Sequence, residues 1–418
     1  MKPYAPLGLL YLSSYLRSKG FDVETYDSTF SSQHELLRTL ETEEPATLGI
    51  YVNLMTRGNA LEILQCALDF GWKVIIGGPE PSSYADRYLA AGAHVVVSGE
   101  GELALEAILR GVPLEQVPGL YFRAGGSTVH TGPARLLPDL DAQPWPDRER
   151  IDIDQYLSVW REHHGAGSVS VITARGCPYH CRWCSHSTFG KTHRRRSAVG
   201  VVDEVEWILN RYHPEQLWFA DDVFTIHHGW LDAYSAEMRR RGLHIPFECI
   251  TRADRLNARV AAQLAELGCD RVWIGSESGS QRILDAMERG VTVAQVRAAV
   301  GQLKQNGIHT GMFFMWGYEG EELSDIEATY EQVQACRPDV FFTTISYPIK
   351  GTPYHDEVAP KLVQLGEWQA TTDRDIKIRG RRSRHFYQLA DQLLRSQTPG
   401  EAALARQSMA EASSEVEA

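Results

Sequence analysis

The first part of the chain alternates short apolar runs with segments whose apolar residues recur every three or four positions. Short runs of the kind that form buried strands lie at 23–27, 47–52, 73–78 and 94–102. Helical spacing occupies residues 6–20, 58–71 and 82–93. Strands that alternate with helices predict an open, parallel, Rossmann-like α/β sheet, whose ligands bind beyond the carboxyl ends of the strands.

The beginning of this sheet departs from the usual pattern. The chain opens with a helix, so the strand that normally comes first is missing, and either the true start lies upstream or the sheet lacks a strand. Residues 119–130 predict a hairpin with a Gly-Gly turn. The segment 136–156, rich in Pro and Asp, predicts an extended linker.

The second part of the chain predicts six successive strand–helix units. The strands are expected at 168–174, 216–220, 246–250, 271–275, 310–315 and 340–346. The helices are expected near 198–211, 229–241, 257–267, 279–288, 292–306 and 323–336. Six consecutive units of this kind predict a partial (β/α)6, TIM-like barrel with its chemistry at the carboxyl ends of the strands.

These patterns divide the chain into four segments. We expect a Rossmann-like domain at 1–125, a linker at 126–165, the barrel at 166–360 and a C-terminal extension at 361–418. The extension ends in a polar, acidic tail that is expected to be disordered.

Composition and charge narrow the functional classes. The chain of 418 residues carries 54 acidic against 42 Lys and Arg side chains, a balance that argues against a protein that coats nucleic acid. No apolar run reaches membrane-spanning length, and the apolar start is followed by Arg17 and Lys19 rather than by a cleavage site. Four of the seven cysteines are scattered singly, which is typical of a reducing compartment, so we expect the protein in the cytoplasm.

The other three cysteines lie together in "RGCPYHCRWCSH" at 175–186, directly after the first barrel strand. Cys177, Cys181 and Cys184 could hold three irons of a 4Fe–4S cluster and leave the fourth iron open. The alternative is a Cys3His zinc site completed by His180 or His186. Zinc ribbons usually bring a second ligand pair from a distant hairpin, and no such pair is present, so the triplet favours the cluster.

This spacing, with Trp183 before the last cysteine, resembles that of the radical S-adenosylmethionine enzymes. The segments at 219–225, 250–256, 273–290 and 311–322 resemble the successive barrel motifs of that superfamily. "GGPEPS" at 77–82 and "SGEGE" at 98–102 resemble the cobalamin-binding half of its cobalamin-associated branch. That branch includes methylases of unactivated carbon and the anaerobic magnesium-protoporphyrin ester cyclase.

The resemblance implies an enzyme that forms a 5′-deoxyadenosyl radical from S-adenosylmethionine at a 4Fe–4S cluster. The expected outcome is methylation of an unactivated carbon of a small-molecule or natural-product substrate, with cobalamin as methyl carrier. The alternatives are radical cyclisation, oxidation or rearrangement on the same scaffold, and a non-catalytic cobalamin or cluster sensor. An electron donor such as flavodoxin or ferredoxin is implied as a partner.

The resemblance also assigns residues to S-adenosylmethionine, and each has an ordinary structural alternative. Asp221 and Asp222 match the group that binds the methionine ammonium; alternatively, either carboxylate caps the helix that follows. Arg252 matches a partner for the methionine carboxylate; alternatively, it forms a salt bridge with Asp254 or another neighbour. Glu277 and Ser278 resemble ribose contacts; alternatively, they cap helix 279–288.

Two further assignments concern the adenine of S-adenosylmethionine and an anion. Gly317, with Glu321, resembles the turn that cradles adenine, although family members often carry proline where this chain has Glu319. "HRRR" at 193–196 could bind an anion, but such a run is more often a solvated helix entry.

The cobalamin assignment rests on loops after the first strands. It takes in six residues: Leu54, Met55, Thr56, Gly77, Gly78 and Gly99. The motif DxHxxG, which supplies a cobalt ligand in some corrinoid proteins, is absent, since "DSTFSSQ" begins at Asp27. The alternative is a degenerate domain kept for shape or interaction.

Overall fold

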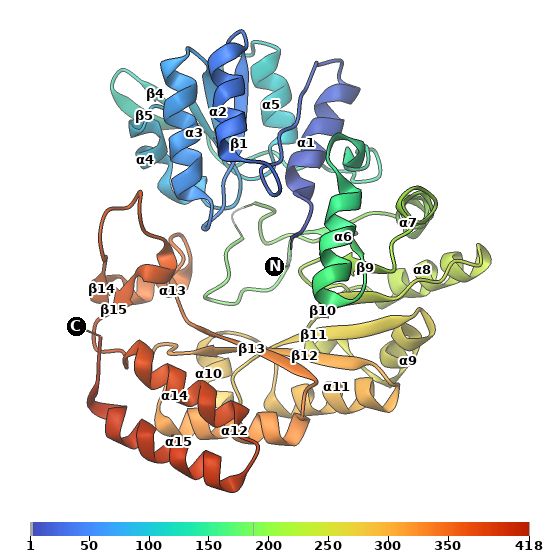
Figure 1. Cartoon of the computed structure of the whole chain (residues 1–418), viewed down its shortest axis with the longest axis vertical. Coiled ribbons are helices and arrows are strands. Elements are labelled where there is room, and N and C mark those ends of the chain that lie inside the picture. Colours follow the sequence, from blue (N-terminus) through green and yellow to red (C-terminus); the bar gives the residue numbers. More distant parts are fainter. Residues whose placement is uncertain (1–2, 187, 418) are drawn as a thin grey trace. The chain divides into compact units, whose positions relative to one another are not determined.

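The structure is a computed structural model, and it describes residues 3–186 and 188–417. The chain divides into two compact units, each of which is described by itself (Figure 1). The first unit comprises Met1–Pro178, Ser185–Glu215 and Glu367–Thr372. The second comprises Tyr179–Cys184, Gln216–Gly366 and Asp373–Ala418.

A sheet of five strands in the order β1-β2-β3-β4-β5 lies in the first unit. Its strands are β1 (Thr47–Tyr51), β2 (Lys73–Gly77), β3 (Val95–Val97), β4 (Leu120–Ala124) and β5 (Ser127–His130). β1, β2 and β3 are parallel, and β4 and β5 form the antiparallel hairpin that the Gly-Gly turn predicts. The predicted strand at 23–27 is wrong, because these residues have no regular structure.

The helices of the first unit include three that were not predicted from the sequence. They are α1 (Leu7–Ser18), α2 (Gln33–Thr42), α3 (Arg57–Asp69), α4 (Ala85–Ala90), α5 (Glu102–Leu109), α6 (Ile153–His164) and α7 (Ala198–Tyr212). The unpredicted ones are α2, α5 and α6. Part of the predicted extended linker is therefore helix α6, which Asp152 caps and Gly165 ends in a left-handed conformation.

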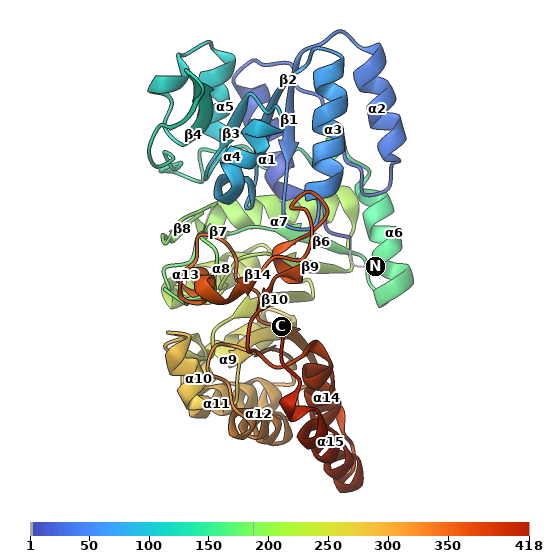
Figure 2. The ribbon, with the colours of Figure 1, turned by 90° about the vertical axis from the view of Figure 1, so that its left-hand side faces the viewer.

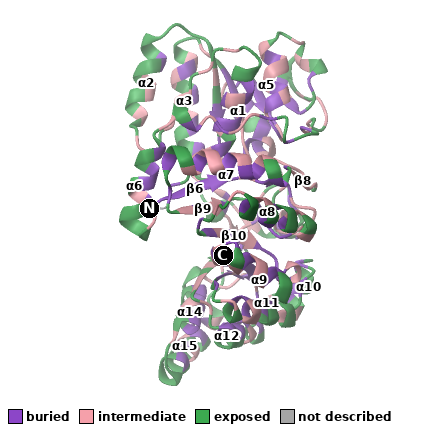
Figure 3. Cartoon of the chain, turned by 90° about the vertical axis from the view of Figure 1, so that its right-hand side faces the viewer, coloured by how far each residue is buried: buried purple, intermediate pink, exposed green. Residues whose placement is uncertain are grey.

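The two faces of the sheet are covered by different helices, because side chains alternate along a strand. On one face, Val74 and Ile76 of β2 pack in a core with Leu64 of α3 and Tyr88 of α4. On the other, Ile75 packs with residues of α5 and of the hairpin. Figure 3 shows the buried strands and the exposed outer faces of α2 and α3.

The second unit contains five parallel strands in the order β13-β12-β11-β10-β9. They are β9 (Gln216–Phe219), β10 (Phe247–Thr251), β11 (Cys269–Glu277), β12 (His309–Trp316) and β13 (Val340–Ile345). The helices between them are α8 (His228–Arg240), α9 (Ala258–Glu266), α10 (Gln281–Ala286), α11 (Val293–Gln305) and α12 (Leu323–Cys336). Each was predicted within a few residues. The first predicted strand also forms, as β6 (Ser168–Val171), so the chain carries the succession of units of a partial (β/α)6 barrel.

The C-terminal extension forms regular helices and strands, although its polar composition predicts disorder at its end. Helix α13 (Pro353–Val358) precedes it, and the extension itself contains β14 (Leu362–Val363), β15 (Lys377–Ile378), α14 (Arg384–Arg395) and α15 (Pro399–Glu411). Figures 1 and 2 show α15 beside α14. The expected disorder is wrong for α15, which begins with a capping box at Thr398, buries Ala402 and Met409, and pairs Arg406 with Glu327. Over the described residues, no helix is long and apolar enough to cross a membrane.

The backbone at Gly78 provides a test of the first sheet. Its φ is 116°, and a Cβ there would lie 2.3 Å from the carbonyl oxygen of Val52. We expect Gly78→Ala to lower the free energy of unfolding by about 2 kcal/mol or more, because both the conformation and the contact are unfavourable. Gly49→Ala is the matched control, since a Cβ there meets no atom within 4 Å. Denaturant titration of both variants checks this, and equal stability would contradict it.

Candidate functional site

The three clustered cysteines lie on a loop whose ends are joined by a short antiparallel ladder. In it, β7 (Ala174–Arg175) pairs with β8 (Arg194–Arg195), with Arg175 opposite Arg194. The loop begins at Gly176, whose φ is 86° and where a Cβ would lie 2.3 Å from the carbonyl oxygen of Thr192. Only glycine fits there. Cys181 is buried, Cys177 is half-buried and Cys184 is exposed.

The donor chemistry of this loop suits an iron–sulfur cluster. All seven cysteines are thiols without disulfide bonds, and three of them are within eight residues. Cys177 belongs to the first unit and Cys181 and Cys184 to the second. Across residues 3–186 and 188–417, no three His, Cys, Asp or Glu side chains gather closely enough to hold a metal ion. The assembly of the three thiols around a cluster therefore stays a prediction.

Two buried arginines lie against the sulfur of Cys181. Nη1 of Arg289 is 3.7 Å from Sγ, and Nη1 of Arg252 is 3.9 Å from it. The guanidinium of Arg252 also covers the ring of Tyr179, 3.6 Å from its centroid. Hydrogen bonds to ligand sulfurs are one means by which a protein sets the potential of an iron–sulfur cluster. Sequence reasoning missed Arg289 and Tyr179, although both lie inside the motifs that carried the resemblance.

Arg252 is already bonded within the protein. Its Nε donates to Oδ1 of Asp254 at 2.8 Å, and its Nη2 donates to the carbonyl oxygen of Arg289 at 2.8 Å. The structural alternative, an ion pair with Asp254, is therefore present in the structure. The contact with a methionine carboxylate stays a prediction.

Glu277 ends β11 in a left-handed conformation with φ of 61°, which is rare for a residue other than glycine. Burial raises the pKa of its carboxyl, while the nearby Arg289 and Arg252 lower it. Gly275 makes room for this pair, because a Cβ there would lie 2.7 Å from both Nη2 of Arg289 and Oε1 of Glu277. Helix α10 has Ser280 as its N-cap, so the capping alternative for Glu277 is wrong.

Ser278 has a structural role in the following turn. It is buried, and its Oγ accepts a hydrogen bond from the backbone N–H of Ser280 at 3.1 Å. Its Oγ also lies 3.3 Å from Oγ1 of Thr329. This matches the alternative of a helix-entry role, and the ribose contact stays a prediction.

The acidic pair after β9 does not cap the next helix. Helix α8 has His227 as its N-cap, so that alternative is wrong for both Asp221 and Asp222. Asp221 is buried, whereas Asp222 reaches the surface. Desolvation by the surrounding protein raises the pKa of Asp222, and the charge of Asp221 raises it further. Their contact with an ammonium group stays a prediction.

The turn after β12 holds a second perturbed carboxyl. Gly317 has a φ of 68°, and a Cβ there would lie 2.9 Å from Cζ of Tyr387. Its N–H donates to Oε2 of Glu321 at 2.7 Å. Burial raises the pKa of Glu321 to about 8, and its buried Oε1 has no hydrogen-bond partner among the described residues. A buried polar atom without a partner suits a ligand that forms a hydrogen bond with it.

The residues assigned to cobalamin lie in loops of the first unit. Leu54, Met55 and Thr56 form the turn between β1 and α3, where Met55 is exposed and Oγ1 of Thr56 accepts from the N–H of Asn53. Two of the three glycines are required by the packing of the protein itself. Gly78 lies against Val52, and a Cβ at Gly99, with φ of 75°, would lie 2.7 Å from Cβ of Ala134. A Cβ added at Gly77 would meet no atom closer than 3.8 Å. Contact of these residues with cobalamin stays a prediction.

Arg57, next to this turn, was missed by sequence reasoning. It is buried, pairs with Glu80 at 2.7 Å, and lies between the rings of Tyr84 and Trp368, 4.8 and 5.0 Å from their centroids. It also donates to the carbonyl oxygens of Trp368 and Thr371 at 3.1 and 2.6 Å. The segment 367–372 thus belongs to the core of the first unit, a contact that no local pattern could indicate.

In the "HRRR" run, two of the three arginines already pair with carboxylates of the protein. The run is therefore not a solvated helix entry, and these two arginines are not open to an anion. Arg194 pairs with Glu100, and Arg196, which is buried, pairs with Glu204. Glu204 is fully buried and also pairs with Arg148 at 2.6 Å, and the two arginines lower the pKa of its carboxyl.

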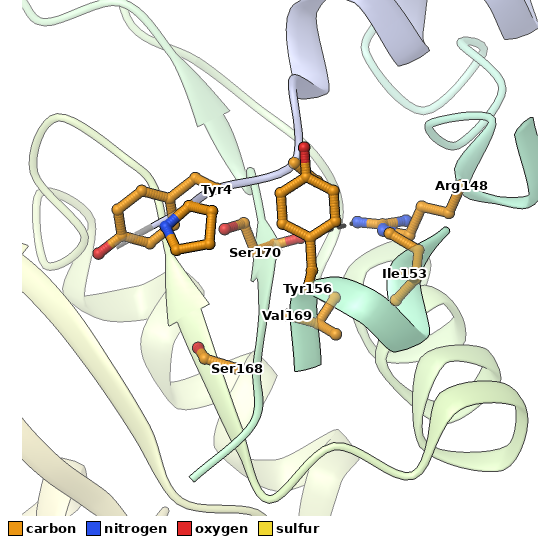
Figure 4. Close-up of a pocket in the computed structure, with 9 residues that line it drawn as sticks. Tyr4, Arg148, Ile153, Tyr156, Ser168, Val169 and Ser170 are labelled. Atoms are coloured by element: carbon orange, nitrogen blue, oxygen red, sulfur yellow. Dashed lines mark hydrogen bonds between the residues drawn. The ribbon is translucent and has the colours of Figure 1, made fainter. Parts of the chain in front are cut away.

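The pocket drawn in Figure 4 is too small for a substrate. Its volume is about 10 Å³, roughly the space of one water molecule. Figure 4 shows Arg148 reaching from one side to the carbonyl oxygen of Ser170, which accepts its hydrogen bond at 2.9 Å. The ring of Tyr156 and the side chain of Ile153 close another side. This pocket is a packing defect beside β6.

Two family models match the chain. One, described as the radical SAM superfamily, matches residues 171–333, and the other, described as a B12 binding domain, matches residues 2–109. An uncharacterized methyltransferase of Pyrococcus horikoshii is 29% identical over 88% of this chain and 82% of its own. The anaerobic magnesium-protoporphyrin IX monomethyl ester cyclase of Cereibacter sphaeroides is 27% identical over 86% of this chain, which spans 61% of the cyclase.

A solved structure has a similar fold. It is the radical S-adenosylmethionine methyltransferase TsrM of Kitasatospora setae, with cobalamin and a 4Fe–4S cluster bound. Its TM-score is 0.71, with 23% identity, over 86% of this chain and 72% of that one.

The raised pKa of Glu321 predicts a stability that depends on pH. Below the ordinary value of 4.5 the carboxyl is neutral in both states, and as pH rises towards about 8 the unfolded chain ionises while the folded chain does not. The folded state therefore loses stability over this window. We expect Glu321→Gln to unfold like the parent chain near pH 5 and to be the more stable near pH 9. Urea titrations at both pH values check this, and a difference independent of pH would contradict it.

Proposed function

Because the chain belongs to the radical S-adenosylmethionine superfamily, in the branch that carries a B12-binding domain, we propose that it is a cobalamin-dependent radical methyltransferase. Its substrate is a small molecule, methylated at an unactivated carbon. The observation that carries this proposal is the pairing of the two family models, with the cysteine loop inside the radical SAM match.

The same two matches confirm the superfamily, its cobalamin branch and the expected cofactors, which are a 4Fe–4S cluster, S-adenosylmethionine and cobalamin. When bound, the cluster supplies the electron that cleaves S-adenosylmethionine to a 5′-deoxyadenosyl radical, and cobalamin carries the methyl group. Methyl transfer, rather than another radical outcome, is supported by the methyltransferase relative at 29% identity.

The protein's own residues then bind and orient these groups. Cys177, Cys181 and Cys184 hold the cluster, and Arg289 and Arg252 donate N–H groups to the sulfur of Cys181. The pKa of Asp222 is raised by desolvation, and binding a cation such as the methionine ammonium offsets the cost of its charge. Glu277, whose pKa burial raises, contacts the ribose together with Ser278. Glu321 offers an unpaired carboxyl oxygen beside Gly317 for a hydrogen bond with a group such as adenine.

Radical cyclisation is the second candidate, because ester cyclases are also among the relatives, at 27% identity for the cyclase of C. sphaeroides. Both candidates use the residues named above. Either reaction needs a one-electron donor, such as flavodoxin or ferredoxin, and a reducing compartment such as the cytoplasm, which the seven thiols suit.

Anaerobic turnover of the reconstituted chain with S-adenosylmethionine and reductant, with and without cobalamin, separates the candidates. Release of 5′-deoxyadenosine together with S-adenosylhomocysteine, dependent on cobalamin, supports methyl transfer. Deoxyadenosine alone, unaffected by cobalamin, contradicts methyl transfer and favours cyclisation or rearrangement. Zinc without acid-labile sulfide contradicts both.

Substitution of one cysteine tests the cluster directly. We expect the parent chain to bind about four iron and four sulfide per chain, and Cys181→Ala to lose most of both with the visible absorption of the cluster. Cys336→Ala, at a buried cysteine at the end of α12, is the matched control and should keep the full content. Iron and sulfide assays after anaerobic reconstitution decide this; equal losses in the two variants would contradict the assignment.

A further inference from the structure

The turn "SGEGE" at 98–102, which resembles part of a cobalamin-binding domain, points its carboxylates at the ends of the cysteine loop. Both acidic side chains of the turn, Glu100 and Glu102, are buried. Their partners are arginines of β7 and β8, the two strands that close the loop. All of these residues belong to the first unit.

Glu100 receives four hydrogen bonds, which fill both of its oxygens. Oε1 accepts from Nη1 of Arg175 at 3.2 Å and from Nη2 of Arg194 at 2.7 Å. Oε2 accepts from Nη1 of Arg194 at 2.9 Å and from the N–H of Leu137 at 2.7 Å. Its bond with Arg194 is therefore two-pronged, the geometry that fixes both partners most firmly.

Arg175 is held just as completely. Its Nη2 lies 2.9 Å from Oε1 of Glu102 and donates to Oε1 of Gln143 at 2.7 Å. Its guanidinium lies over the ring of Tyr11, 4.9 Å from the centroid. Gln143 in turn donates to Oε1 of Glu102 at 2.7 Å, which closes the network. We call these five residues the loop-end network: Glu100, Glu102, Gln143, Arg175 and Arg194.

The charges of the loop-end network balance, with two carboxylates against two guanidinium groups. The side chains of Glu100 and Arg175 are 1% and 4% exposed, so an unpaired charge there would be strongly unfavourable. Removal of the charge of Glu100 leaves Arg194 without a carboxylate partner among the contacts described here. Within the network, Glu100 is the residue that bonds to the arginines at both ends of the loop, whereas Glu102 and Gln143 bond to Arg175 alone.

We propose that Glu100 is a positioning residue that fixes both ends of the cysteine loop and thereby determines how firmly the loop holds its cluster. Arg175 lies two residues before Cys177, and Arg194 lies directly opposite Arg175 in the ladder. The carboxylates of the turn thus serve the cysteine loop rather than cobalamin. This inference rests on the proposed function, since the cluster is the group that the loop is to hold.

The first test needs no cofactor. Hydrogen exchange of the full chain without cluster is compared between the parent, Glu100→Gln and Glu80→Gln. Glu80 is a matched control because it is also buried and paired with one arginine, Arg57, outside the loop. We expect Glu100→Gln to raise the exchange rate of segment 176–193 by about tenfold or more and Glu80→Gln to leave it unchanged. Equal exchange in the parent and in Glu100→Gln overturns the inference.

The second test uses the reconstituted chain. Loss of a residue that orients a metal ligand typically lowers metal affinity about 10- to 100-fold. Glu100 acts on the ligands through Arg175 and Arg194, so we expect the lower end of this range, with a chelator removing iron from Glu100→Gln about tenfold faster than from the parent. We also expect the electron paramagnetic resonance spectrum of the reduced cluster to change in Glu100→Gln and to match the parent in Glu80→Gln. A general loss of stability would instead change iron release and the spectrum in both variants, since each removes one charge of a buried ion pair.

The outcomes separate the two proposals. A parent chain that binds no cluster overturns the proposed function, while the exchange measurement still decides whether Glu100 fixes the loop. A parent chain with a cluster, together with unchanged iron release and spectrum in Glu100→Gln, overturns the inference alone. Faster iron release from both variants also overturns it, because the effect would then follow general stability.

Discussion

A buried charge must be neutralised where it lies, and in the first unit this requirement joins segments that are far apart in the sequence. The idealised cost of desolvating an ion is large, and in proteins it is still several kcal/mol, so each buried arginine needs a carboxylate within hydrogen-bond distance. Arg57 with Glu80, Arg148 with Glu204 and Arg175 with Glu100 all satisfy it. Removing one partner of such a pair costs about 3–5 kcal/mol, far more than the pair itself contributes, so these contacts specify position more than they add stability.

The elements that could be predicted from sequence are those whose signal is local. The strands of the second unit are short apolar runs bounded by turn residues, and such runs carry their own signal. Helix α6 had a signal too, in the apolar spacing of Ile153, Tyr156 and Trp160, but the prolines before it favoured a linker. The strand expected at 23–27 failed because alternation alone does not supply a neighbouring strand to pair with.

The candidate site also combines features that are local in the sequence with contacts between distant residues, and only the local ones could be predicted. The cysteine spacing is contained in eight residues and could be recognised directly. The approach of Arg289 to Cys181 depends on how α10 ends, 108 positions away, and the stacking of Trp368 on Arg57 spans 311 positions. Glycines show another limit of the sequence: positions 78 and 99 need glycine for the close approach of the protein's own atoms, whether or not a ligand also lies there. A glycine that lets a ligand approach the backbone and a glycine that lets a neighbouring residue approach it cannot be distinguished in the sequence.

The donors of Arg252 limit what else it can hold. A guanidinium has five N–H groups. Here Nε donates to Asp254, Nη1 to the sulfur of Cys181, and Nη2 to the carbonyl oxygens of Arg289 and Gly290. One N–H, on Nη1, has no acceptor in this set. While these contacts persist, Arg252 can therefore donate one hydrogen bond to a carboxylate but cannot form two parallel hydrogen bonds with it. Its firmest role in this structure is therefore to join the loop of Cys181 to the turn after α10, and a methionine carboxylate would need a second donor besides Arg252.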